Sequence, residues 1–79
     1  MYSSIIEYKH RGIDHKVEDK LEALRKRYRG RSNGSGYGFI AQTRDAEYSF
    51  KSKKDRDAFN TQVLKELKKL KIMVSINEG

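Results

Sequence analysis

The chain contains no cysteine, no proline and no tryptophan. Without cysteine it can form neither a disulfide framework nor a thiolate metal site, so packing must supply its stability. No apolar run approaches the roughly 18 residues of a membrane span, and the first residues do not resemble a signal peptide. We therefore expect no membrane partner and a cytoplasmic location, in the host cytoplasm if the protein is viral, with the nucleus as the alternative compartment.

The length and composition predict one small folded domain. The chain has 79 residues, of which 37% are charged and 35% are hydrophobic. A chain of this length buries only about 60% of the surface that its unfolded form exposes, so its core must be thin. The share of hydrophobic residues is still sufficient for folding, and we expect a single basic domain over residues 1–79.

Positive charge is unevenly distributed along the chain. The formal net charge is +7, from 18 basic and 11 acidic residues. Residues 25–31 hold five cations and no acid, and residues 53–71 hold seven cations and three acids. Clustered cations favour a polyanionic partner, because clustering concentrates counterions that binding can release.

The hydrophobic pattern of the first half predicts a strand followed by a helix. Residues 2–9 alternate imperfectly, which is typical of a strand with Ile6 and Tyr8 facing inward. Asp14 is a suitable N-cap and Gly30 a suitable C-cap for the helix between them. The apolar stripe of this helix has a spacing of three and four residues and comprises Ile13, Val17, Leu21, Leu24 and Tyr28.

The second half predicts a hairpin, a second helix and a last strand. Residues 29–36 have the composition of a flexible Arg, Gly and Ser loop, and alternation then predicts strands over 37–43 and 46–51. Arg44 and Asp45 would form the turn between these strands. Residues 72–76 alternate as the last strand. Ser52 and Asp55 resemble a capping box for the second helix, whose stripe comprises Phe59, Val63, Leu67 and Leu70.

The predicted order of elements is strand, helix, strand, strand, helix, strand. This order is typical of the ferredoxin-like α+β sandwich (βαββαβ), a four-stranded antiparallel sheet with two helices on one face. We place the first and third strands at the centre of the sheet. Homodimerisation through the other, open sheet face, or through an edge strand, is a structural side-hypothesis. That face would display a mixed set of residues: Ile5, Glu7, Lys9, Ile40, Gln42, Ser49, Lys51, Met73 and Ser75.

The glycines and aromatics of residues 35–42 are similar to the RNA-recognition-motif consensus. Residues 36–39 match this consensus. Ser35 stands where the consensus has a cation, Gln42 stands where it has the last aromatic, and the first strand has no counterpart to the partner motif. The resemblance is short, and we do not assign the chain to the family. Tyr37 is the candidate for base stacking, and the alternative is that Tyr37 and Phe39 face the helices as part of the core.

Catalytic or metal-binding chemistry has little support in the sequence. His10, Asp14 and His15 could form a site of two histidines and one carboxylate, but a pair of surface histidines at a strand–helix junction is commoner. No serine lies in a G-x-S-x-G elbow. We therefore predict neither an enzyme nor a metal site or other cofactor.

The sequence favours a non-enzymatic module that binds DNA or RNA through the phosphate backbone, with low sequence specificity. An alternative is a small basic interaction or inhibitor protein, of a viral or mobile-element type, that docks on an acidic surface of a host protein or sequesters a phosphorylated ligand. Both hypotheses place the cations on the surface. The predicted phosphate contacts come from the end of the first helix, the segment after it and the second basic segment: Arg25, Lys26, Arg27, Arg29, Arg31, Lys53, Lys54, Lys68 and Lys69.

Overall fold

A computed structural model describes residues 1–9, 15–38 and 43–78, apart from the side chain of Tyr37. These residues form one four-stranded sheet and two helices. The predicted types and order of the elements are confirmed. In chain order they are β1 (Tyr2–Lys9), α1 (His15–Arg27), β2 (Arg31–Gly38), β3 (Thr43–Phe50), α2 (Lys53–Lys69) and β4 (Val74–Asn77).

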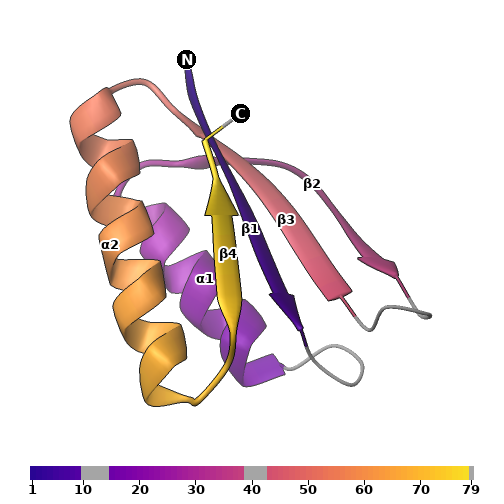
Figure 1. Cartoon of the computed structure of the whole chain (residues 1–79). Helices are drawn as coiled ribbons and strands as arrows, with labels where there is room; N and C mark the ends of the chain where they lie inside the picture. The colour runs from indigo at the N-terminus through magenta and orange to yellow at the C-terminus, as the bar shows by residue number, and fades with distance from the viewer. Residues whose placement is uncertain (10–14, 39–42, 79) are drawn as a thin grey trace.

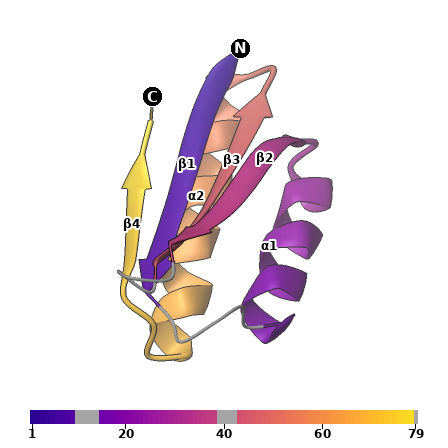
Figure 2. The same cartoon turned by 90° about the vertical axis from the view of Figure 1, so that its right-hand side faces the viewer.

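The strands lie in the order β2-β3-β1-β4, and every neighbouring pair is antiparallel. Both helices cover the same face of the sheet, and the opposite face is open (Figure 1 and Figure 2). β1 and β3 are therefore the central strands, as predicted. This arrangement is the ferredoxin-like α+β sandwich.

Alternation along β1 directs one set of its side chains toward the helices. Ser4, Ile6 and Tyr8 are buried, whereas Glu7 is exposed. Successive side chains of a strand point to opposite faces, so the alternating pattern predicts the inward face correctly. The buried Ser4 hydroxyl is satisfied because it donates a hydrogen bond to Oδ1 of Asn60 on α2.

The core lies between the sheet and the helices. The Phe59 ring of α2 packs against two rings of β3, with centroid distances of 5.1 Å to Tyr48 and 4.9 Å to Phe50. The predicted helical stripes supply most of the remaining contacts through Val17, Leu21, Leu24, Val63 and Leu67. Tyr28 and Leu70, at the ends of the stripes, are less covered, and Ile13 lies outside the described residues.

The segment after α1 is a strand, which corrects the loop expected over residues 29–36. Residues 31–36 pair with β3 as the first part of β2. β2 thus begins at Arg31 and not at residue 37, and β3 begins at Thr43 and not at residue 46. Arg44 and Asp45, the expected turn, both lie within the β2–β3 ladder.

Pairing with β3 explains why a segment of glycine, serine and asparagine forms a strand. The ladder supplies hydrogen bonds that outweigh the poor strand propensity of these residues. A bulge interrupts the register between Ser32 and Gly34, and Gly34 has a φ of 138°, which favours glycine. The residues that connect β2 to β3 lie outside the described part of the chain.

α1 ends in a Schellman motif, in which two amides beyond the helix donate to carbonyls of its last turn. The Arg29 amide donates to the Lys26 carbonyl (3.2 Å), and the Gly30 amide donates to the Arg25 carbonyl (2.8 Å). The residue with positive φ in this motif is usually glycine, but here it is Arg29, with a φ of 59°. Gly30, the C-cap expected from the sequence, lies one residue beyond the left-handed position.

Gly30 is needed for a different reason, which is the close approach of Phe50. A Cβ atom at Gly30 would lie 2.5 Å from Cε2 of the Phe50 ring. This ring is buried in the core and has little room to move. The glycine therefore allows the chain to pass close to the core before it enters β2.

α2 ends in the same motif, with Lys71 in the left-handed position at a φ of 58°. The amides of Lys71 and Ile72 donate to the carbonyls of Lys68 and Leu67, each at 3.0 Å.

Because glycine adopts this conformation without strain, we expect Lys71→Gly to raise the free energy of unfolding by about 1 kcal/mol. Urea unfolding measures the change. Lys65→Gly, inside the helix, is the matched control and should lower the same quantity by about 1 kcal/mol, whereas a loss in Lys71→Gly would contradict the account.

Candidate functional site

The two helices run antiparallel, and this arrangement decides which charged segments meet. α1 ends and α2 begins at the end of the sandwich where β1 and β2 start and β3 finishes (Figure 1 and Figure 2). We call this the basic end. It gathers eight cations, namely Arg25, Lys26, Arg27, Arg29, Arg31, Lys51, Lys53 and Lys54.

Lys68 and Lys69, which we expected to share this surface, lie at the opposite end of α2. The helical distance from Lys53 to Lys68 is about 22 Å at 1.5 Å per residue. Exposed charges interact over only about 8–10 Å at physiological salt. Lys69 also lies 3.8 Å from Glu66, which forms a second ion pair with Lys20 of α1 at 3.0 Å. The structure therefore divides the predicted phosphate-binding residues between two ends.

Arg25 belongs to the predicted set but is bound by its own helix end. Its Nε donates to Oε2 of Glu22 (2.9 Å), its Nη2 donates to Oε1, and its Nη1 donates to the Gly30 carbonyl (3.0 Å). The two hydrogen bonds to Glu22 stabilise its carboxylate and lower its pKa. The Arg25 guanidinium thus closes the last turn of α1 and is less available to a ligand than its neighbours.

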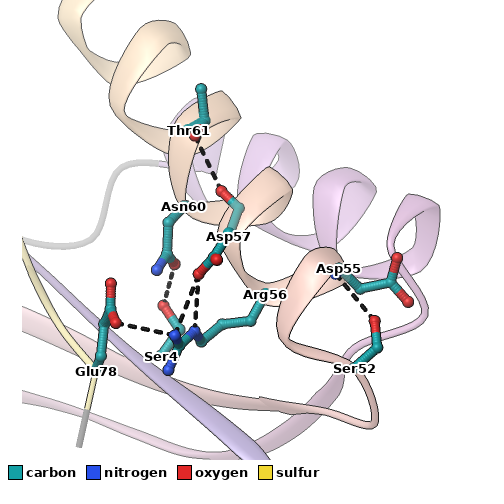
Figure 3. A network of polar contacts seen from close by, with 8 residues as sticks. All are labelled: Ser4, Ser52, Asp55, Arg56, Asp57, Asn60, Thr61 and Glu78. Atoms are coloured by element: carbon teal, nitrogen blue, oxygen red, sulfur yellow. Dashed lines mark hydrogen bonds and ion pairs between the residues drawn. The ribbon is translucent and has the colours of Figure 1, made fainter.

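Arg56 is buried, so it is an exception to the expectation that the cations lie on the surface. Its guanidinium pairs with Asp57 (3.1 Å) and with Glu78 beyond β4 (2.9 Å), as Figure 3 shows. It also lies over the Tyr2 ring of β1. A buried cation requires such partners, and two of these partners, Tyr2 and Glu78, are far from Arg56 in the sequence. Arg56 therefore ties the start of α2 to both ends of the chain.

The carboxylates nearest to Arg25 and Arg56 already form ion pairs. Glu22 is held by Arg25, and Asp57 and Glu78 are held by Arg56. Within the described part of the chain, the other cations of the basic end form no ion pair, and all are exposed. Such neighbouring charges repel one another and favour an anionic ligand. We call them the unpaired cations: Lys26, Arg27, Arg29, Arg31, Lys51, Lys53 and Lys54.

A hollow of about 290 Å³ opens at the basic end and is lined by Met1, Arg29, Arg31, Ser49 and Lys51. Arg31 of β2 pairs with Ser49 of β3, so their side chains share one face of the sheet. Ser49 lies between Tyr48 and Phe50 of the core, which makes this the open face. Three of the lining residues are unpaired cations, and no acidic residue is among them.

Lys51 is the site residue that sequence reasoning missed. Alternation over residues 46–51 placed it on the open face of the sheet, but nothing connected it with the arginines after α1. Its proximity to Arg31 follows from the β2–β3 register, in which Arg31 lies opposite Ser49. The expected hairpin had the wrong register because it omitted residues 31–36 from the sheet.

The open face becomes acidic away from the basic end. Glu7 pairs with Asp45 and Ile5 pairs with Glu47 in the β1–β3 ladder, which places three carboxylates close together on this face. Among the described open-face side chains of β1, β3 and β4, none is aromatic. Carboxylates repel phosphates, and they also give little support to an apolar dimer interface on this face.

Tyr37, the candidate for base stacking, pairs with Arg44 in the β2–β3 ladder. Its side chain and the whole of Phe39, Ile40 and Gln42 lie outside the described residues. Stacking by Tyr37 therefore stays a prediction, as does the alternative that Tyr37 and Phe39 belong to the core.

A polar cluster joins α1 to three strands, away from the basic end. Tyr8 donates to Glu18 (2.6 Å), and Arg44 donates to the same carboxylate (2.6 Å) and to the Gly36 carbonyl (3.1 Å). Burial alone would raise the pKa of Glu18, but the hydrogen bonds from Arg44 and Tyr8 outweigh it and lower this pKa. Burial and the bond to Glu18 raise the pKa of Tyr8 far above its ordinary value. The arrangement suits a structural clamp that holds the edge strand β2.

The clamp predicts a pH-dependent loss of stability. A carboxylate with a lowered pKa stabilises the fold above its ordinary pKa of about 4.3, and this contribution disappears as the pH falls through the folded-state pKa. We therefore expect Glu18→Gln to lower the free energy of unfolding most near pH 7 and much less near pH 3. Urea unfolding at several pH values measures the difference. A difference that stays constant with pH would contradict the clamp, and Glu7→Gln on the open face is the control that should change stability little.

The described residues show neither a cluster of metal ligands nor a helix that could cross a membrane. No group of three or more histidines and carboxylates there could hold a metal ion, while His10 and Asp14 lie outside the described part. No described helix combines the length and the apolar character that crossing a membrane requires.

The fold and the site together define a small ferredoxin-like α+β protein with unpaired cations gathered at one end of its sandwich. The sequence matches no known protein-family model and no curated protein. Charge and geometry are therefore the basis on which a function can be proposed.

Proposed function

We propose that the protein is a non-enzymatic nucleic-acid-binding module that contacts phosphates through its basic end. The observation that carries this proposal is the convergence of the unpaired cations from the end of α1, the start of β2, the end of β3 and the start of α2. Each phosphate that Arg or Lys neutralises releases condensed counterions. A ligand with closely spaced phosphates therefore gains the most from this surface.

The arrangement of charge also supports a particular path for the ligand. A strand that followed the open face would approach Glu7, Asp45 and Glu47, which repel phosphates. A strand that crosses the basic end meets the unpaired cations of α1, β2, β3 and α2, with the carboxylate of Asp55 beside them in the first turn of α2. Contacts of this kind position the backbone without reading base edges, so low sequence specificity is expected.

The salt dependence of binding tests this function directly. If five to seven phosphates are neutralised, the logarithm of the association constant for duplex DNA should fall against the logarithm of salt concentration with a slope of about −4.5 to −6.3. Fluorescence anisotropy between about 50 and 200 mM salt measures the slope, which should be shallower for single strands. An association constant that does not change over this range would contradict the proposal. Failure to retard DNA or RNA, together with stoichiometric co-purification with an acidic protein, would favour the alternative partner.

Charge-removing variants locate the binding surface. Arg27→Gln and Lys53→Gln should each reduce the salt slope by about 1, with little effect on stability, because both residues are exposed. Lys68→Gln is the matched control, since it removes an exposed cation from the same helix as Lys53 but at the opposite end. Equal losses for Lys68→Gln and Lys53→Gln would show that the protein binds through its overall charge and not through the basic end.

A further inference from the structure

The hollow at the basic end is built from the ends of three strands. Ser49 lies in β3, and Lys51 directly follows Phe50, the last residue of this strand. Arg31 is the first residue of β2, Arg29 precedes it by two residues, and Met1 precedes β1. The hollow thus lies at one end of the sheet, and no residue of α2 lines it.

The charge around this hollow is unbalanced. Arg29, Arg31 and Lys51 line it, no carboxylate does, and none of the three forms an ion pair within the described residues. Arg29, Arg31 and Lys51 border the same hollow, and like charges held this close repel one another. A bound anion would relieve this repulsion.

Ser49 adds a hydrogen-bonding group to the hollow. The residue is 4% exposed, and its hydroxyl donates to Oδ1 of Asn33 over 3.4 Å, which is long for a hydrogen bond between oxygens. A serine hydroxyl can rotate to suit another acceptor. It can therefore donate to an anion that enters the hollow.

Arg29 adopts a conformation that is unfavourable for a residue with a side chain. Its φ of 59° is in the left-handed region, which costs roughly 1–2 kcal/mol for residues other than glycine. Glycine would relieve this strain but would remove a guanidinium from the border of the hollow. Lys71 has the same strained conformation at the end of α2, and Arg29 differs from it because it borders the unbalanced hollow.

We propose that the hollow binds the terminal phosphate of a nucleic-acid strand, a proposal that rests on the proposed function. A phosphodiester carries one negative charge, whereas a phosphomonoester carries about 1.5 to 2 near neutral pH. Three cations and a hydroxyl around one hollow match the monoester better than the diester. The remaining unpaired cations, Lys26, Arg27, Lys53 and Lys54, contact the diester backbone that leads away from it.

Inorganic phosphate tests the hollow without a strand. In an NMR titration at constant ionic strength, with chloride as the control anion, we expect saturable shifts of the Arg31, Ser49 and Lys51 amides. Arg29→Gly should weaken phosphate binding roughly tenfold or more, because a charge-assisted hydrogen bond is lost. The same variant should unfold at a higher urea concentration, which separates the loss of binding from misfolding. No saturable shift in the natural chain, or unchanged affinity in Arg29→Gly, would overturn the proposal.

Oligonucleotides test the connection with strand ends. One short single strand is prepared with a 5′ phosphate, with a 3′ phosphate and with neither. We expect at least one phosphorylated form to bind roughly tenfold more tightly than the unphosphorylated form. Lys51→Gln should abolish this preference, whereas the control Lys53→Gln should weaken all three forms equally and keep it.

The outcomes distinguish the two proposals. Equal and salt-dependent affinities for all three strands would overturn the terminal-phosphate site and leave the proposed function standing. Failure of all three strands to bind would overturn both. Loss of the preference in Lys53→Gln to the same degree as in Lys51→Gln would also overturn the assignment of the terminal phosphate to the hollow.

Discussion

The antiparallel packing of α1 and α2 on one face of the sheet determines where the charge of this chain lies. Each helix carries cations in its last turn, where the helix dipole favours them: residues 25–27 in α1 and 68–69 in α2. Because the helices point in opposite directions, these two groups lie at opposite ends of the sandwich. The contacts of Phe59 with Tyr48 and Phe50 hold α2 against β3. The packing therefore places these two groups of cations, which are similar in composition, far apart in the structure.

The arginines that the structure describes fall into two kinds. Arg25, Arg44 and Arg56 bind carboxylates of their own chain, and they close a helix, hold an edge strand and anchor the start of α2, respectively. A domain with a thin core gains from such links. They also use up acidic groups that would otherwise neutralise the neighbouring side chains. The ion pairs that stabilise the fold therefore also preserve the positive charge of the basic end, although different residues form the ion pairs and carry that charge.

The sequence predicts the order of elements, the central strands and the inward faces of both helices, because these follow from local periodicity. It misplaces β2, because the glycines and serines of residues 31–36 form a strand only through pairing with β3. It predicts the arginines after α1 as candidate site residues, but the position of Lys51 beside them and the separation of Lys68 from them depend on register and helix direction. The burial of Arg56 depends on Glu78, which follows the last strand. The start of β2, the position of Lys51 and the burial of Arg56 depend on contacts between distant segments, which a local pattern cannot predict.

The central claim is that the basic end is the surface that meets nucleic acid, and amide chemical-shift mapping with a short DNA or RNA duplex tests it most directly. The account predicts shifts that saturate together over residues 26–31 and 51–54. Residues 65–71, at the other end of α2, should stay unchanged, as should the acidic part of the open sheet face. Shifts centred on residues 65–71, or on Glu7 and Asp45, would contradict the account.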